Sequence, residues 1–122
     1  MERTIHIDDD YMTLKEIKDQ FSNYFPHLKI EFFEHPHRTG EGSMEQSKID
    51  EAFRLRDIRK EGLMETFAIH GNLKTQTLES KFSDLYGVNI QVYKKRGNTW
   101  IQTTSTDNWT LSQQEKSTEE IK

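Results

Sequence analysis

Residues 67–92, FAIHGNLKTQTLESKFSDLYGVNIQV, contain the signals that decide the fold. Apolar residues first alternate with small or polar ones, which predicts a half-buried strand. They then recur at the spacing of a helical face, as Leu78, Phe82 and Leu85, and Gly87 provides the left-handed position at which helices often end. The last five residues alternate again, so the stretch predicts a strand, a helix and a second strand.

A similar order occupies residues 5–32 in the first half of the chain. Two alternating segments flank a stripe of helical period. The members of this stripe are Leu14, Ile17, Phe21 and Tyr24. Thr13 and Glu16 form the T-x-x-E pattern of a capping box, which predicts the helix start. Pro26 predicts its end, because proline cannot continue the helical hydrogen bonds.

Matching positions in the two halves lie at a nearly constant separation. Ile7 and Ile69 are 62 positions apart, Phe21 and Phe82 are 61 apart, and Leu28 and Val88 are 60 apart. This regularity predicts an internal duplication, although two unrelated strand–helix–strand units would share the same coarse pattern. In tandem the two units give the order β-α-β-β-α-β, which predicts an α+β fold of the ferredoxin-like type, a two-layer sandwich.

Further elements follow the second repeat. Arg-Gly-Asn at 96–98 predicts a hairpin into a fifth strand, in a register that sets Tyr93 opposite Trp100. Thr110 and Gln113 form a T-x-x-Q capping box and predict a short C-terminal helix. The expected organisation is a single domain over 1–112, with repeat one at 3–34, a mobile loop at 35–48, a short helix or packed loop over 49–58, repeat two at 63–94, the added strand at 99–104, and a polar tail at 113–122.

One face of the expected sheet carries no helix, and the alternation of side chains identifies the residues that point there. Its distinctive members are the aromatic residues Phe33, Tyr93 and Trp100 and the histidines His6 and His70. Three exposed aromatic side chains on one face indicate a contact surface. The alternative is that the C-terminal segment, with Trp109 and Leu111, folds back and covers them.

Composition limits the function classes that remain. The 122 residues include no cysteine, which excludes disulfides, thiolate metal sites and a cysteine nucleophile. Charged residues make up 31% and the mean hydropathy is −0.94, so we expect a small core inside a strongly solvated shell. No segment approaches the roughly 18 apolar residues of a membrane span, and the first ten residues lack the apolar stretch of a signal peptide. We therefore expect a cytoplasmic protein without a membrane partner.

Histidines are the main candidate metal ligands in this chain. His35 and His37 form an H-x-H pair that Glu31 or Glu34 could complete as a two-histidine, one-carboxylate site. Pro36 breaks the strand between them, however, and no second ligand spacing supports the site. We expect no metal.

Catalytic chemistry has little support in the sequence. His6 and His70 would be neighbours if their strands pair, and two close imidazoles could titrate together near neutral pH. No nucleophile motif, paired carboxylates or glycine-rich phosphate loop accompanies them. The three aspartates at 8–10 precede the first expected helix, where they favourably oppose its dipole. We therefore expect no catalytic residue, no cofactor and no enzymatic activity.

Nucleic-acid binding is the alternative to a protein partner. The order of elements is also that of RNA-recognition motifs, and basic residues cluster at 94–96 and 54–60. The net charge of −4 has the wrong sign for an interaction driven by phosphate groups. We therefore expect a non-enzymatic domain that binds a protein partner or a second copy of itself through the open face or an edge strand, with single-stranded nucleic acid as the alternative ligand.

Two segments also carry a family resemblance. The pattern G-N-x-x-T-x-T-L-E-x-x-F-x-x-x-Y-G-V-x-I-Q-V, from Gly71 to Val92, is similar to small bacterial proteins of uncharacterised function with two tandem strand–helix–strand repeats. The pattern M-T-L-K-E-I-K-x-x-F, from Met12 to Phe21, resembles their opening segment. The resemblance implies a compact two-repeat domain and brings no catalytic motif with it.

Overall fold

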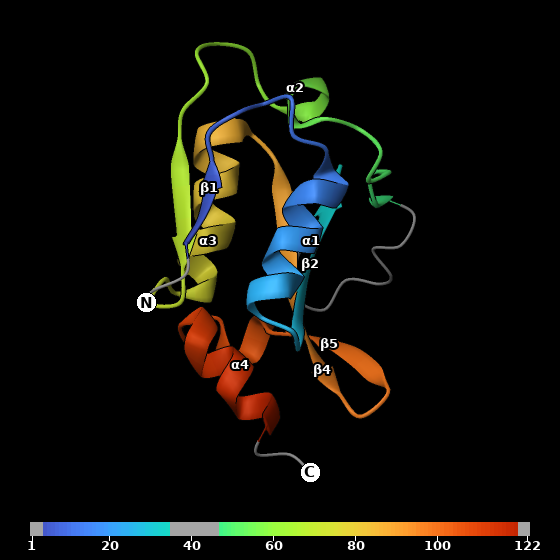
Figure 1. Cartoon of the computed structure of the whole chain (residues 1–122), viewed down its shortest axis with the longest axis vertical. Helices are drawn as coiled ribbons and strands as arrows, with labels where there is room; N and C mark the ends of the chain where they lie inside the picture. Colours follow the sequence, from blue (N-terminus) through green and yellow to red (C-terminus); the bar gives the residue numbers. More distant parts are fainter. Residues whose placement is uncertain (1–3, 35–46, 120–122) are drawn as a thin grey trace.

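Strands and helices alternate along residues 4–34 and 47–119, the parts of the chain that the computed structural model describes (Figure 1). The main elements in chain order are β1 (Thr4–Ile7), α1 (Leu14–Tyr24), β2 (Leu28–Phe33), α2 (Leu55–Ile58), β3 (Phe67–His70), α3 (Thr75–Lys81), β4 (Asn89–Arg96), β5 (Thr99–Gln102) and α4 (Leu111–Glu119). The expected α+β class is therefore confirmed. Most of the expected loop at 35–48, namely residues 35–46, lies outside the described residues.

The described strands form two small antiparallel sheets. β1 pairs with β3, and β2, β4 and β5 form the second sheet in that order. A ferredoxin-like sheet would instead join the four repeat strands in one layer and would place β2 beside β3. The two longest strands of the repeats, β2 and β4, pair with each other over six residues, which satisfies more backbone groups than pairing either of them with a four-residue strand. The ferredoxin-like strand order is thus not found in the described residues.

Helix α1 begins and ends where local signals place it. Thr13 Oγ1 accepts the Glu16 N–H at 3.1 Å, and the Glu16 carboxylate accepts the Thr13 N–H at 3.4 Å, which completes the predicted capping box. The helix ends at Phe25, immediately before Pro26. The face of α1 that carries Leu14, Ile17 and Phe21 is buried, and this burial fixes the orientation of the helix on β2.

Helix α3 ends in a π-helical turn that spans Phe82–Tyr86. Gly87 follows in the left-handed conformation, with φ of +66°, as the sequence predicts. The wider turn buries the Tyr86 ring, and the Tyr86 hydroxyl donates a hydrogen bond of 2.8 Å to the Glu65 carbonyl. Leu85, which the sequence places in the stripe, is only half-buried.

The hydrophobic core is one contiguous cluster that draws on both halves of the chain. Helices contribute the stripes of α1 and α3, and strands contribute the alternate residues of β1 to β4. Its buried members are Ile5, Ile7, Leu14, Ile17, Phe21, Phe25, Leu28, Ile30, Phe32, Leu55, Ile69, Leu78, Phe82, Tyr86, Val88, Ile90, Val92 and Leu111. The two halves therefore share one core and form one folding unit.

The same backbone contacts recur where a turn meets the start of each long helix. In the first half, Leu14 N–H donates to Phe53 C=O and Leu55 N–H donates to Met12 C=O; in the second, Thr75 N–H donates to Trp109 C=O and Leu111 N–H donates to Leu73 C=O. Each half thus carries a short helix, α2 or α4, anchored beside the first turn of its long helix. A short C-terminal helix and a short helix or packed loop over 49–58 were predicted, but the equivalent contacts of α2 and α4 were not.

The hairpin between β4 and β5 has a different register from the one expected. Arg96 lies opposite Thr99, so the loop consists of Gly97 and Asn98 alone. Gly97 takes a φ of +61° at the first loop position, as a type II′ turn requires. Lys95 therefore lies opposite Trp100, and the predicted pairing of Tyr93 with Trp100 is wrong by two residues. The added strand is also shorter than predicted, because a 3₁₀ turn begins at Thr104.

Residues 113–119 differ from the expected polar tail, because they continue helix α4. The predicted capping box at its start is present: Thr110 N–H donates to Gln113 Oε1 at 2.8 Å, and Gln113 N–H donates to Thr110 Oγ1 at 3.1 Å. The side chain of Gln114 is fully buried and donates to Thr75 Oγ1 and to the Thr106 carbonyl. These polar contacts hold a helix that has few apolar residues.

The contribution of α4 to stability can be measured with one core substitution. Leu111→Ala should lower the free energy of unfolding by about 2–5 kcal/mol, because it leaves a cavity in the core. Urea unfolding followed by circular dichroism measures the change. The control is Lys116→Ala, an exposed position on the same helix, which should stay within about 0.5 kcal/mol of the wild type. Equal stability of all three proteins would mean that α4 does not belong to the core.

Candidate functional site

A lysine-rich aromatic surface lies on the side of the second sheet that faces away from the core. We call it the hairpin surface. It consists of Lys29, Tyr93, Lys95 and Trp100. Strand pairing places these side chains on one face, because Lys29 lies opposite Tyr93 and Lys95 lies opposite Trp100. The β4–β5 hairpin that carries most of them projects from the rest of the molecule (Figure 1).

Lysine side chains lie over the aromatic rings of this surface. The Lys29 Nζ is 5.0 Å from the centre of the Trp100 ring and 5.5 Å from that of Tyr93, and the Lys95 Nζ is 5.9 Å from Trp100. Each such contact contributes about 0.5–1 kcal/mol at an exposed site. The Trp100 side chain is thereby oriented, although 38% of the residue remains exposed. The surface thus presents an ordered aromatic group surrounded by cations.

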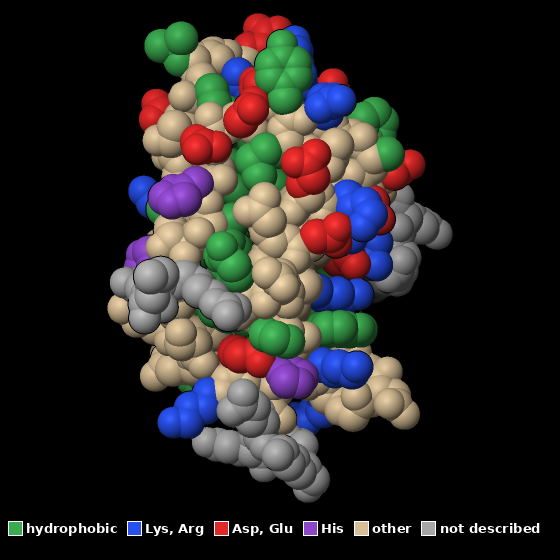
Figure 2. Space-filling model, in the orientation of Figure 1, with side chains coloured by type: hydrophobic (Ala, Val, Ile, Leu, Met, Phe, Trp, Pro, Cys, Tyr) green, Lys and Arg blue, Asp and Glu red, His purple; other side chains and the backbone are tan. Residues whose placement is uncertain are grey.

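The positive charge of the hairpin is not balanced by acidic residues close to it in the sequence. Residues 85–106 contain Lys94, Lys95 and Arg96 but no aspartate or glutamate, in a chain whose net charge is −4. In the described part of the chain, neither Lys95 nor Arg96 forms an ion pair. Figure 2 shows red and blue side chains interleaved over the upper part of the molecule, whereas the charged side chains over the hairpin, at the lower right, are blue. The hairpin is therefore a local cationic region.

A charge network fixes the other edge of the surface, next to Lys29. The Glu31 carboxylate lies 2.7 Å from Lys18 Nζ, 3.2 Å from Lys29 Nζ and 3.7 Å from Lys48 Nζ. Burial alone would raise the pKa of Glu31, but the ammonium group of Lys18 lowers it overall. Lys18 also reaches Glu51 at 2.9 Å, so the network ties α1, β2 and the segment after residue 47 together.

Phe33 does not belong to the hairpin surface. We expected it to be exposed on the open face, but only 1% of the residue is accessible to solvent. The segment around Lys48 runs beside this end of β2 and forms a bridge with Phe33. Glu34 N–H also donates to the Ser47 carbonyl there, at 2.8 Å. The expected exposure of Phe33 is therefore wrong.

His6 and His70 lie on the other sheet, away from Tyr93 and Trp100. Thr4 lies opposite His70 and His6 lies opposite Ala68, so the two histidines are diagonal neighbours on one face. The predicted proximity of the histidines is therefore found. Because β1 and β3 pair with each other and not with β2 and β4, the structure does not bring the histidines into one site with the aromatic residues.

The C-terminal segment does not bury the hairpin surface. Leu111 inserts into the core, and Trp109 stays 37% exposed with the Lys94 Nζ 5.1 Å from its ring centre. Lys94 alternates with Tyr93 along β4, so Trp109 lies on the opposite side of the strand from the hairpin surface. The alternative that this segment covers Trp100 is thus excluded for the described residues.

Glu79 carries a partly buried carboxyl group that the sequence does not single out. It projects from α3 and accepts the backbone N–H of Val92 at 3.1 Å, at the point on β4 where β5 ends. Burial raises the pKa of Glu79 to about 7; the Val92 hydrogen bond opposes this rise and the charge of Asp107 adds to it. No sequence signal identifies it, because its position depends on the packing of α3 against β4.

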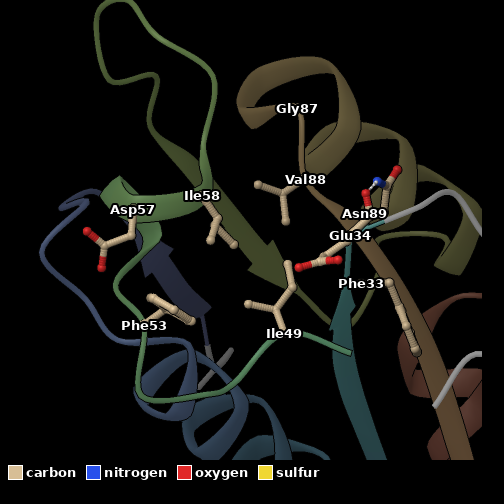
Figure 3. A pocket seen from close by; sticks show the side chains of 9 residues that line it. All are labelled: Phe33, Glu34, Ile49, Phe53, Asp57, Ile58, Gly87, Val88 and Asn89. Atoms are coloured by element: carbon tan, nitrogen blue, oxygen red, sulfur yellow. Dashed lines mark hydrogen bonds between the residues drawn. The ribbon is translucent and has the colours of Figure 1, made fainter. Parts of the chain in front are cut away.

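A pocket of about 310 Å³ lies beside the far end of β2 (Figure 3). Ile49, Ile58 and Val88 converge on it from three segments, and its rim includes the polar residues Glu34 and Asp57. Asp57 already accepts a backbone hydrogen bond at the start of α2. Apolar walls with carboxylates at the rim would suit an apolar group that carries a positive charge. No other feature of the pocket points to a ligand.

The remaining sequence candidates do not form a second site. Among the described residues, no three histidine, aspartate or glutamate side chains are grouped so that they could hold a metal ion. His35 and His37 lie outside the described residues. None of the helices in residues 4–34 and 47–119 is long and apolar enough to span a membrane.

Comparisons with known proteins give no further information on this site. A scan against family models, a search of curated proteins and a search of solved structures each find no match to this chain.

The raised pKa of Glu79 predicts a specific dependence of stability on pH. The folded state keeps Glu79 protonated up to about pH 7, whereas the unfolded state ionises it near 4.5. The stability that this group contributes is therefore complete below 4.5 and is lost as pH rises through about 7. Glu79→Gln keeps an acceptor for Val92 but cannot ionise. Between about pH 5 and pH 8, the wild type should lose about 2–3 kcal/mol more stability than this variant.

Denaturant unfolding of both proteins at the two pH values provides the measurement. Other titrating groups are common to both and cancel in the difference. A variant that loses as much stability as the wild type would show that Glu79 is ionised in the folded protein at neutral pH.

Proposed function

We propose that this protein is a non-enzymatic interaction domain that binds a protein partner through the hairpin surface. The observation that supports this proposal most directly is the pair Tyr93 and Trp100, which lie on the outward face of a projecting strand pair and are contacted by lysine side chains. Large aromatic groups supply much of the binding energy when a partner buries them. Their partial ordering in the free protein lowers the entropy cost of binding.

The cations around the aromatic residues define the kind of partner. Lys95 and Arg96 are exposed and have no acidic neighbour within the hairpin, so an acidic protein surface would complement them. Such charges mainly accelerate association and select the partner, while the aromatic groups determine how long the complex lasts. A second copy of the chain is the other protein partner that the proposal allows.

Single-stranded nucleic acid is the second candidate ligand. The observation that favours it is the combination of lysines with aromatic side chains on an open sheet face, since bases stack on such groups while phosphates contact the cations. The total charge of −4 opposes it. Nuclease treatment separates the two candidates, because only a nucleic-acid complex is lost with it.

Internal duplication and a cytoplasmic location are also part of the proposal. Leu14 and Thr75 begin helices α1 and α3 and are 61 positions apart. Met12 and Leu73, whose carbonyl groups accept equivalent hydrogen bonds, are also 61 positions apart. These equivalences support two copies of one β-α-β-α unit, in line with the resemblance to two-repeat bacterial proteins. Within the described residues, the second copy continues into a projecting hairpin, so we assign binding to that copy.

Removal of the two aromatic side chains tests the proposed function. The double variant Tyr93→Ala, Trp100→Ala should lose at least about 2 kcal/mol of binding free energy for the partner, because it removes both aromatic rings of the surface. Calorimetry with the partner purified from the native host measures the affinity. The fold should be retained, because neither residue belongs to the core cluster.

A matched control removes two exposed aromatic rings from elsewhere on the molecule. Tyr11 is 57% exposed and Phe53 is 49% exposed, and neither lies on the second sheet. The variant Tyr11→Ala, Phe53→Ala should bind as the wild type does. Equal losses in the two double variants would show that exposed aromatic area in general, and not the hairpin surface, determines binding.

A further inference from the structure

The outer edge of β5 is open. Arg96 with Thr99 and Lys94 with Ile101 are the hydrogen-bonded pairs of the hairpin, because a two-residue loop closes with such a pair and the pairs then alternate. The backbone N–H and C=O groups of Trp100 therefore point away from β4, toward solvent. The backbone N–H and C=O groups of Gln102 also point toward solvent. Within the described residues, no other segment bonds to these groups.

Several other outward-facing backbone groups of this sheet have partners. On the β2 edge, Ile49 N–H donates to the Phe32 carbonyl at 2.9 Å. On β4, beyond the end of β5, Glu79 accepts the Val92 N–H and Thr103 N–H donates to the Val92 carbonyl. The chain thus supplies a partner for strand edges at several places but leaves Trp100 and Gln102 without one. An unpaired edge of this kind accepts an additional strand.

The side chains beside this edge favour a ligand with negative charge. Lys95 and Arg96 lie at its hairpin end, Lys29 lies across the sheet at 5.0 Å from the Trp100 ring, and no acidic residue occurs between positions 85 and 106. Side chains of an added strand would alternate between the two faces of the sheet, so every second one would lie over Trp100 and the lysines. Acidic residues at those alternate positions would complement them.

We propose that the edge of β5 binds an extended acidic segment of a partner protein as an additional β-strand. The proposal rests on the proposed function of the hairpin surface and specifies how the partner is held. Backbone hydrogen bonds to Trp100 and Gln102 provide the pairing, while contacts of alternate acidic side chains with Lys29 and Lys95 provide selectivity. A nucleic acid has no peptide groups to pair with this edge, so the edge favours a protein ligand.

The test is a titration of ¹⁵N-labelled protein, followed by NMR, with the capped peptide acetyl-Glu-Val-Glu-Thr-Glu-Val-amide. The amide signals of Trp100 and Gln102 should show the largest shifts and slower exchange with solvent. A peptide with lysine in place of each glutamate should bind at least about tenfold more weakly, because its charges repel the hairpin. Methyl groups on the backbone nitrogens along one edge of the acidic peptide block the hydrogen bonds of that edge. Binding should also be lost with this methylated peptide.

A pair of variants at one position isolates the backbone contact. Gln102→Pro removes the outward N–H group, and Gln102→Ala removes the same side chain but keeps that group. The proline variant should bind the acidic peptide at least about tenfold more weakly than the wild type, and the alanine variant should stay within about twofold of it. If the proline variant does not give a folded spectrum, the methylated peptide provides the same test on the ligand side.

Three results would overturn the proposal: no shift at millimolar peptide, shifts centred away from Trp100 and Gln102, or equal binding of the blocked and unblocked peptides. An eight-nucleotide oligothymidylate that shifts these signals where the acidic peptide does not would also overturn it, in favour of nucleic acid. The loss of partner affinity in the Tyr93, Trp100 double variant is measured separately. If strand addition fails, the double variant still tests whether the hairpin surface binds a partner.

Discussion

The antiparallel pairing of β2 with β4 is the contact on which the rest of the structure depends. It joins the second strands of the two halves over six residues and turns Ile30 and Val92 toward the shared core. The same register turns Lys29 and Tyr93 to the opposite face. A shift of one residue would exchange the two faces, burying charge and exposing the apolar set, so the core itself fixes the geometry of the hairpin surface.

In the described part of the chain, several strand edges and charges outside the hairpin find partners within the molecule. Glu31 balances cations from three different segments, and Glu79 accepts the backbone N–H of Val92. Such pairing is expected where polar groups are buried, because an unsatisfied buried group costs about 1–3 kcal/mol. At Trp100 and Gln102, by contrast, an edge, an aromatic ring and uncompensated cations coincide. That coincidence distinguishes the hairpin from the rest of the surface.

Structural features that depend on a few neighbouring residues were predicted correctly from the sequence. The capping boxes at Thr13 and Thr110, the stop at Pro26 and the left-handed Gly87 all depend on neighbouring residues, and all occur where predicted. They place the helices and strands but do not say which strands meet. The apolar alternation of each strand also predicted the core faces of β2 and β4, because that pattern is itself local.

Features that depend on contacts distant in sequence were predicted poorly. The pairing of β2 with β4 was missed because the strand order of tandem units was inferred by analogy with a known fold, and analogy does not fix pairing. The hairpin register was wrong by two residues, since Gly97 takes the first loop position and not the second. The burial of Phe33 was missed, and the segment near Lys48 that pairs beside it is not revealed by its own strand.

Photo-crosslinking in the native host tests the central claim most directly. A photoreactive phenylalanine analogue at position 100 reports contacts of the hairpin, and the same analogue at position 63 serves as the control, because Leu63 is the most exposed large apolar residue and lies before β3. We predict a discrete protein adduct from position 100 that survives nuclease and is absent from position 63. Identical adducts from both positions, no adduct from position 100, or adducts that disappear with nuclease would contradict the account of this hairpin as a protein-binding surface.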